Sequence, residues 1–122
     1  MEVPLVLIAD DIILNFEILK YHLHDRNIVF LWASNGVEAI KRVESNPGIN
    51  LIFMDYMMPV MDGIEATMNI KKINPDIPVI LHSAFDDHEI TNKFRIAGCS
   101  DILPKPVDKV KLNAIVDHYL RK

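Results

Sequence analysis

Short apolar segments alternate along this chain with longer segments in which apolar residues recur at helical spacing. The apolar segments have the length of strands. Several do not alternate apolar with polar residues, which is typical of strands in a parallel sheet flanked by helices on both faces. The five predicted strands comprise residues 3–9, 28–33, 51–54, 79–81 and 102–103.

Five helices are predicted, one after each strand. Their apolar stripes follow the period of 3.6 residues that characterises a helix with one buried side. The stripes run through residues 12–23, 37–43, 64–73, 90–97 and 112–120. In the third helix, the stripe expected to face the core consists of Ile64, Met68 and Ile73.

Capping residues mark some of the predicted helix ends. Ser34 is the predicted N-cap of the second helix, and Asp86 or Asp87 is the predicted N-cap of the fourth, because these side chains accept hydrogen bonds from free backbone amides. Gly98 follows the fourth helix, where the left-handed conformation of a C-terminal cap favours glycine.

The regular order of strand and helix predicts an open, doubly wound α/β sandwich. Parallel strands need crossover helices, and these crossovers are right-handed. No linker, repeat or low-complexity segment divides the sequence, so residues 1–122 are expected to form one domain. In such folds, ligands bind beyond the carboxyl ends of the strands.

Polar side chains stand where the predicted strands end. Asp10 and Asp11 follow the first strand, Asp55 the third, Ser83 the fourth and Lys105 the fifth. Three clustered carboxylates repel one another, and a hard divalent cation together with an ammonium group removes that conflict. Oxygen ligands favour Mg²⁺, with Mn²⁺ or Ca²⁺ as alternatives, and Mg²⁺ keeps positions open for phosphate oxygens.

Asp55 is the best candidate for a nucleophile in this cluster. It stands alone at the end of a central strand, whereas Asp10 and Asp11 are adjacent and suit metal binding. An aspartate can attack phosphorus and form an acyl phosphate. Ser83 could then donate a hydrogen bond to a phosphoryl oxygen, and Lys105 could pair with Asp55 at rest and with the phosphoryl group afterwards.

Composition argues against several other classes of protein. The chain has 13 basic and 17 acidic residues, and its net charge of −4 does not suit a nucleic-acid-binding surface. No apolar run approaches the roughly 20 residues that span a bilayer, and acidic Glu2 does not fit a secretory signal. The single cysteine, Cys99, cannot form an internal disulfide, so a cytoplasmic location is expected.

Four segments at the strand ends resemble those of a known family. They are Ala9-Asp10-Asp11, residues 54–63 (Met-Asp-Tyr-Met-Met-Pro-Val-Met-Asp-Gly), Ser83-Ala84 and Lys105-Pro106. In this order they make the chain resemble the receiver domains of two-component response regulators along nearly its full length. The long loop motif, together with Asn15, is most similar to receivers carried by hybrid sensor histidine kinases.

The resemblance implies a flavodoxin-like fold with five parallel strands in the order 2-1-3-4-5. It also implies a phosphoacceptor rather than an enzyme, in which Asp55 takes a phosphoryl group from the phosphohistidine of a sensor histidine kinase or phosphotransfer protein. The surface around the fourth helix, fifth strand and fifth helix would then switch. An output domain or protein and a weak homodimer are further expected partners, without direct contact to nucleic acid or membrane.

The resemblance further implies how the metal is held. Asp11 and Asp55 would ligate Mg²⁺ directly, together with the backbone carbonyl of Met57. Asp10 would act mainly through water.

Two further residues receive roles from the resemblance, and a third departs from the family pattern. Ser83 and Lys105 would contact the phosphoryl oxygens, and the Lys105–Pro106 peptide would be cis. Ile102 stands at the switch position, where the family commonly has a Tyr or Phe that turns inward on activation. An aliphatic side chain has no ring to turn. The usual coupling between Ser83 and the fifth strand, which depends on that ring, is therefore not expected here.

Other interpretations of the same residues stay open. A pseudo-receiver that acts as a phosphorylation-independent interaction module is the main alternative, and Ile102 favours it. An aspartyl phosphatase of the haloacid dehalogenase type expects a second Asp where Met57 stands, and a flavin-binding domain expects a phosphate cradle that the first loop lacks. His82 stands where the family more often has an aliphatic or small residue; a histidine at a strand end with satisfied hydrogen bonds is the simplest interpretation, and an influence on the electrostatics of the pocket is the alternative.

Overall fold

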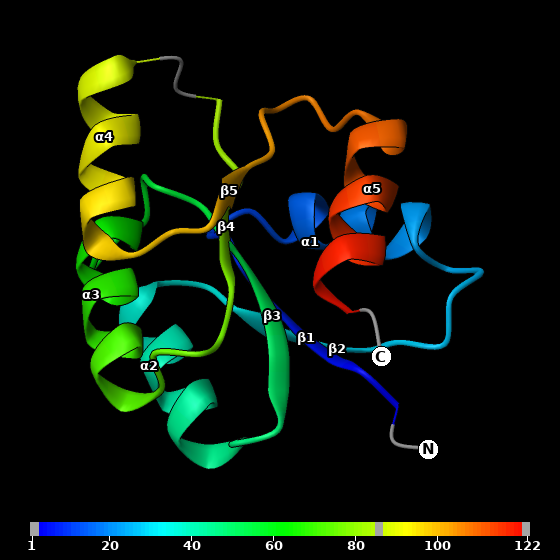
Figure 1. Ribbon diagram of the computed structural model, residues 1–122, viewed down its shortest axis with the longest axis horizontal. Helices are drawn as coiled ribbons and strands as arrows, with labels where there is room; N and C mark the ends of the chain where they lie inside the picture. The colour runs from blue at the N-terminus through cyan, green and yellow to red at the C-terminus, as the bar shows by residue number, and fades with distance from the viewer. Residues whose placement is uncertain (1–2, 85–86, 121–122) are drawn as a thin grey trace.

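The computed structural model describes residues 3–84 and 87–120, in which five strands alternate with five helices (Figure 1). The predicted strands all occur, with ends that differ by at most two residues. The elements are β1 (Leu5–Ala9), α1 (Ile13–His22), β2 (Val29–Ala33), α2 (Gly36–Ser45), β3 (Ile49–Met54), α3 (Gly63–Ile73), β4 (Val79–Leu81), α4 (His88–Ala97), β5 (Asp101–Ile102) and α5 (Lys109–Tyr119).

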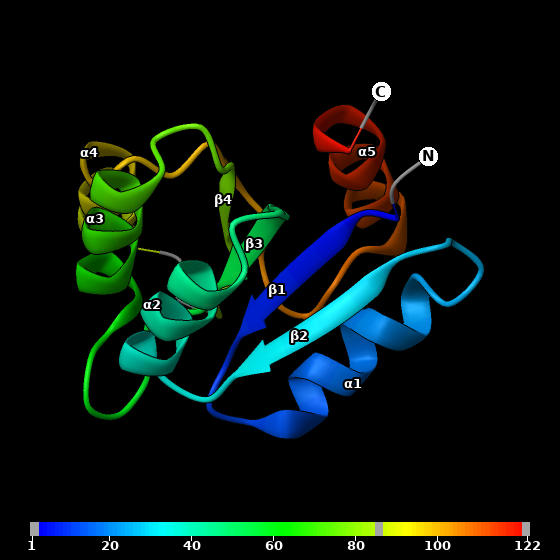
Figure 2. The same ribbon diagram turned by 90° about the horizontal axis from the view of Figure 1, so that it is seen from below.

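The strands form one parallel sheet in the order β2-β1-β3-β4-β5, which confirms the predicted flavodoxin-like fold. Helices α1 and α5 cover one face of the sheet, and α2, α3 and α4 cover the other (Figure 2). Because all strands point the same way, their carboxyl ends meet at one edge. That edge carries the residues that follow β1, β3, β4 and β5.

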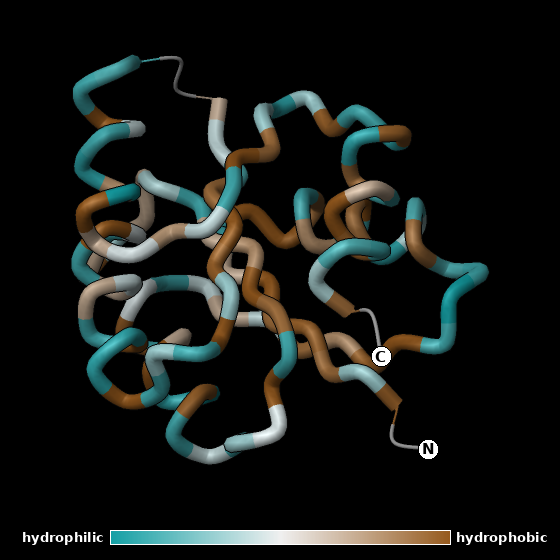
Figure 3. The backbone as a smooth tube through the Cα atoms, in the orientation of Figure 1, coloured by the Kyte–Doolittle hydropathy of each residue, from teal (hydrophilic) through white to brown (hydrophobic). Residues whose placement is uncertain are grey.

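Each central strand contributes side chains to two apolar clusters, one on each face of the sheet. Val6 and Ile8 of β1 pack with residues of α1 and α5, whereas Leu7 and Ala9 pack with residues of α2, α3 and α4. Figure 3 shows apolar residues running along the central strands. Burial on both faces explains why these segments do not alternate apolar with polar residues.

Side-chain caps fix the starts of the helices. Asp87 caps α4 as predicted by accepting a backbone N–H of the first turn, while Asp86 lies outside the described residues. The prediction for Ser34 is wrong, because Asn35 caps α2 by accepting the Glu38 N–H at 2.8 Å. Ser34, the residue before this N-cap, instead donates its backbone N–H to the Glu38 carboxylate at 2.9 Å.

The buried face of α3 also differs from the prediction. Met68 and Ile73 are 48% and 45% exposed, and small residues face the sheet in their place. The reason is that α3 lies very close to the strand ends: a Cβ on Gly63 would lie 1.9 Å from the backbone oxygen of Asp55. The buried residues of α3 are Gly63, Ala66, Thr67 and Ile70.

We therefore expect Gly63→Ala to destabilise the protein and to displace Asp55. The new methyl group would overlap a backbone atom, which cannot rotate away as a side chain could. Overpacking of this kind costs about 1–3 kcal/mol, measurable as a lower midpoint of urea unfolding.

Gly48→Ala is the matched control for this substitution. No heavy atom lies within 4 Å of a Cβ built on Gly48, so its free energy of unfolding should change by no more than about 0.5 kcal/mol. Equal stability of the two variants would contradict the close approach of α3 to Asp55.

Candidate functional site

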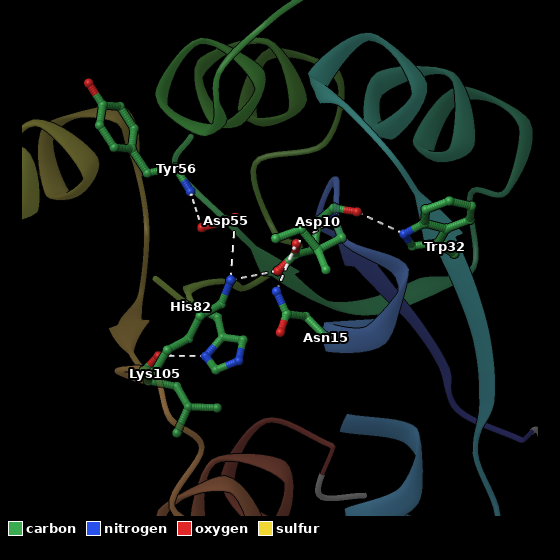
Figure 4. A network of polar contacts seen from close by, with 9 residues as sticks. Asp10, Asn15, Trp32, Asp55, Tyr56, His82 and Lys105 are labelled. Atoms are coloured by element: carbon green, nitrogen blue, oxygen red, sulfur yellow. Dashed lines mark hydrogen bonds and ion pairs between the residues drawn. The ribbon is translucent and has the colours of Figure 1, made fainter. Parts of the chain in front are cut away.

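The hydrogen-bond ladder of the sheet continues one residue beyond β1 and β3 and fixes the first two acidic positions. The Asp10 N–H donates to the Ala33 carbonyl at 2.9 Å, and the Asp55 N–H donates to the Ala9 carbonyl at 3.0 Å. Both backbones are therefore held as rigidly as the strands themselves. Their carboxylates lie side by side at the carboxyl edge of the sheet (Figure 4).

Asp10, Asp11 and Asp55 form one cluster, with a carboxylate oxygen of each within 4.8 Å of the others. Asp10 and Asp55 are buried, at 1% and 8% exposure, while Asp11 is exposed. Such a set of charged oxygens fits a small, hard divalent cation and does not suit soft metals. The structure thus brings together the three carboxylates that the sequence placed at this edge.

Lys105 supplies the positive charge beside this cluster. Its Nζ lies 2.7 Å from Asp10 Oδ2 and 3.4 Å from Asp55 Oδ2, with the side chain 17% exposed. The sequence predicted Asp55 as its resting partner, whereas the shorter contact is with Asp10. The ammonium therefore bridges two carboxylates. The Lys105–Pro106 peptide is cis, as the resemblance implied.

Asp10 accepts hydrogen bonds through both its carboxylate and its backbone carbonyl. Its Oδ1 accepts the Ile12 N–H at 2.9 Å and the Asn15 side-chain amide at 3.2 Å. Its backbone carbonyl accepts the indole N–H of Trp32 at 2.8 Å. No hydrogen bond from Trp32 was predicted, although its place on β2, the strand beside β1, is a signal that it can reach this edge.

Asp55 combines burial with two partners of its carboxylate. Oδ1 accepts the Tyr56 N–H at 2.8 Å, and Oδ2 faces Lys105. Burial raises the pKa of the Asp55 carboxyl above its ordinary value of 3.8, although the Lys105 ammonium acts in the opposite direction. The Tyr56 ring meets the edge of Phe94 in α4, with ring centroids 5.9 Å apart, a contact that the sequence did not predict.

Met57, Ser83 and Ile102 lie around the acidic cluster. Met57 belongs to the loop after Asp55 and lines a hollow of about 580 Å³ together with Asp11. Ser83 is buried at the end of β4 and lines, with Ile102 and Lys105, a hollow of about 470 Å³ beside α4. No ring reaches this second hollow from the Ile102 position.

A family model for the response regulator receiver domain matches residues 6–117. The chain belongs to this family. Receiver domains are phosphoacceptors rather than enzymes in the usual sense. The acidic cluster, Ser83 and Lys105 all lie within the matched residues 6–117.

Two curated relatives show the range of proteins that carry similar receiver domains. A cyclic di-GMP phosphodiesterase of Thermotoga maritima is 34% identical over 116 residues, 95% of this chain and 31% of the relative. The autoinducer 1 sensor kinase/phosphatase LuxN of Vibrio campbellii is 30% identical over 122 residues, 98% of this chain and 14% of the relative. The chain thus spans less than a third of either relative.

Two solved structures have closely similar folds. A chain of the CheX–CheY–BeF₃–Mg²⁺ complex from Borrelia burgdorferi matches with a TM-score of 0.89 and 27% identity, covering 98% of this chain and 90% of that one. A chain of the complex between the histidine phosphotransfer protein Ypd1 and the Ssk1 receiver domain of Saccharomyces cerevisiae matches with a TM-score of 0.84 and 29% identity, covering 96% and 88%. Within the described residues, no helix is both long and apolar enough to cross a bilayer.

The buried Asp55 carboxylate predicts a pH-dependent stability of the metal-free protein. Because the native state raises its pKa, the folded protein binds more protons than the unfolded chain between pH 3.8 and the raised pKa. Stability falls as pH rises through this window. Asp55→Asn removes the buried charge and leaves Lys105 paired with Asp10, so it should raise the midpoint of urea unfolding at neutral pH in EDTA.

This gain should shrink toward zero below pH 3.8, where Asp55 is protonated in both states. Asp76→Asn, at an exposed position, is the control and should show no such pH dependence. If Asp55→Asn is no more stable than the wild type at neutral pH, the ion pair with Lys105 fully offsets the free-energy cost of burying the Asp55 carboxylate.

Proposed function

We propose that this receiver domain is a magnesium-dependent phosphoacceptor and that Asp55 takes the phosphoryl group from a phosphohistidine. The observation that carries the proposal is the position of the Asp55 carboxylate. It is buried, lies within 4.8 Å of two other acidic groups and has an ammonium 3.4 Å away. A nucleophile, a cation site and a positive donor thus surround one point.

The transfer requires one bond to form and one to break. A carboxylate oxygen of Asp55 bonds to phosphorus while the P–N bond of the donor breaks, and the imidazole leaves with that electron pair and takes up a proton. Hydrolysis of the acyl phosphate later returns the carboxylate and inorganic phosphate. A bound Mg²⁺ would supply positive charge to the phosphoryl oxygens, held by Asp11, Asp55 and the Met57 carbonyl, with Asp10 acting through water.

Lys105 and Ser83 complete the set of donors. The Lys105 ammonium already lies between Asp10 and Asp55, so it needs only a small movement to reach an anion on Asp55. The Ser83 hydroxyl, at the end of the next strand, can donate to another phosphoryl oxygen. Fixed donors of this kind act at the developing charge without reorganisation of solvent.

We infer that phosphorylation is read out at α4, β5 and α5. The new group adds acceptor oxygens and about two negative charges next to Lys105 and Ser83. Both residues line the hollow between α4 and β5, which Ile102 also lines. A shift of Ser83 and Lys105 toward the phosphoryl group therefore changes this hollow directly and biases the surface above it.

The exposed face of α1 suits the partner that carries the phosphohistidine. Leu14, Ile18 and Tyr21 share one face of the helix and are 63%, 36% and 69% exposed. The helix begins shortly after Asp11, so this apolar stripe leads away from the acidic site. An exposed apolar patch of this kind is typical of an interaction surface, and the similar Ssk1 receiver was solved with a histidine phosphotransfer protein.

We further propose that residues 1–122 act as a single receiver domain in a cytoplasmic signalling pathway, in the setting of a larger hybrid histidine kinase. The similarity to LuxN, a sensor kinase/phosphatase, supports this setting. An output domain or protein would bind at the α4–β5–α5 surface, and a weak homodimer would form there. The sign of the net charge, −4, favours protein partners over direct contact with nucleic acid.

Ile102 favours a second candidate function, a pseudo-receiver that binds partners without phosphorylation. The aliphatic side chain cannot reproduce the movement of a ring into the hollow beside Ser83. In that case the acidic cluster would be a structural remnant. The two functions differ in whether Asp55 reacts, which can be measured directly.

Incubation with acetyl phosphate and Mg²⁺ should add the mass of one phosphoryl group to the chain. Asp55→Asn should abolish the mass increase, because it removes the nucleophile, and EDTA should abolish it in the wild type. Intact-protein mass spectrometry checks both results. Asp76→Asn, at an exposed position away from the strand ends, should be phosphorylated as the wild type is.

The contrary outcome is a folded wild-type protein with no mass increase. If beryllofluoride and Mg²⁺ also leave its amide NMR spectrum unchanged, the pseudo-receiver function replaces the phosphoacceptor function.

Leu14→Ser should slow phosphotransfer from a phosphorylated histidine phosphotransfer protein such as yeast Ypd1. The loss of a buried leucine from an interface costs about 1.5–3 kcal/mol, roughly a tenfold or greater loss in rate at limiting concentrations. Reaction with acetyl phosphate should stay unchanged, because that small donor needs no docking surface. Rates of both reactions can be followed by the same mass measurement.

Ile96→Ser, at a 79% exposed position of α4 on the other face of the sheet, is the matched control. It should leave transfer from Ypd1 intact. Equal losses in the two variants would exclude the α1 stripe as the docking surface.

A further inference from the structure

His82 is a buried polar residue directly beneath the functional site. It follows β4 and precedes Ser83, and only 5% of its surface is exposed. Its backbone N–H donates to the Met54 carbonyl at 2.9 Å, which continues the ladder between β3 and β4. Its side chain turns instead toward the end of β5.

The imidazole makes one short hydrogen bond. His82 Nδ1 lies 2.7 Å from the backbone carbonyl oxygen of Leu103 (Figure 4). Because a carbonyl can only accept, the proton of this bond must sit on Nδ1. Burial lowers the pKa of His82, which favours the neutral ring, so the ring is a fixed Nδ1–H donor.

This bond acts on the segment that carries Lys105. Two ladder bonds already join the ends of β4 and β5: the Leu103 N–H donates to Leu81 at 2.7 Å, and the Lys105 N–H donates to Ser83 at 3.0 Å. The His82 side chain adds a third connection between them, to the carbonyl of Leu103. Three hydrogen bonds therefore hold residues 103–105, the backbone from which the Lys105 side chain extends.

We infer that His82 is a positioning residue for Lys105: its Nδ1–H bond to the Leu103 carbonyl orients the segment that directs the ammonium between Asp10 and Asp55. The imidazole touches neither the phosphoryl group nor the metal in this role. An aliphatic residue of similar size would fill the same space without making the bond. Burial of an imidazole is costly unless its polar atoms are satisfied, and here the bond satisfies Nδ1 and fixes the segment.

This inference rests on the proposed phosphoacceptor function, and the test separates the two. His82→Leu removes the donor and keeps an apolar side chain of similar bulk. Phosphorylation of Asp55 by acetyl phosphate should slow roughly tenfold, the loss expected for one well-placed hydrogen bond that aligns a reacting group. The affinity for Mg²⁺, followed by the fluorescence of the single tryptophan Trp32, should change by less than about twofold, because the carboxylates hold the metal.

Two variants distinguish positioning from general destabilisation. His82→Asn places an amide donor at the same distance along the side chain as Nδ1 and should restore most of the rate. His82→Gln places the donor one bond further out and should not, and it also serves as the test if His82→Leu does not fold.

A double-mutant cycle with Lys105→Ala identifies the residue through which His82 acts. If His82 works through Lys105, His82→Leu should cause no further loss of rate in the Lys105→Ala background. The same tenfold loss in both backgrounds, or a parallel loss of Mg²⁺ affinity, would overturn the inference. A normal rate in His82→Leu would overturn it while the phosphoacceptor function stands, whereas a wild-type protein that is not phosphorylated would overturn both.

Discussion

The contact between the Lys105 ammonium and the carboxylates of Asp10 and Asp55 is the interaction on which the site depends. Two buried acids and a third exposed one gather within 4.8 Å, an arrangement that like charges oppose. A single ammonium, 2.7 Å and 3.4 Å from the two buried groups, offsets only part of this repulsion. The remaining negative charge favours a divalent cation, and once that cation is present the site has room for the charge of a phosphoryl group. In the proposed function, the excess negative charge would favour the cation, and the cation in turn would favour the phosphoryl group.

The parallel sheet is what makes this concentration of charge possible. Strand ends that are neighbours in space come from residues far apart in sequence, so Asp10, Asp55 and Lys105 are brought together by backbone hydrogen bonds rather than by their own attraction. A side chain at position 63 would overlap the Asp55 backbone, so glycine there permits the close approach of α3 to the site. Because the sheet buries apolar side chains on both faces, its folding energy can offset the repulsion at its edge. Burial of the apolar core thus offsets the electrostatic repulsion among the acids, and the backbone hydrogen bonds between the strands fix the geometry of the site.

The sequence was sufficient for the fold and for the clustering of the three acids beside Lys105, because both follow from strong local patterns. Apolar runs such as residues 51–54, repeated between helical stripes, favour strands covered on two faces, and the acids stand directly after them. It was insufficient where small residues or side-chain geometry decide. In α3 the core face is built by Gly63, Ala66 and Thr67, which carry little apolar signal, so Met68 and Ile73 were wrongly placed in the core. The shorter pairing of Lys105 with Asp10, and the bond from His82 to Leu103, depend on side-chain torsions that no spacing rule contains.

In the proposed function, the chemistry of the site and the transmission of its signal would be physically separable. The carboxylates, Ser83 and Lys105 lie at the edge formed by the ends of β1, β3, β4 and β5, and none of them requires an aromatic side chain at the position of Ile102. The proposed output surface, by contrast, would depend on how the hollow beside Ser83 is filled, and at position 102 the side chain lining that hollow is aliphatic. What remains to couple the two is the movement of Ser83 and Lys105 themselves. If His82 positions Lys105 as we infer, such a movement would carry the ends of β4 and β5 together, and the signal would travel through the backbone of the two strands rather than through a turning ring.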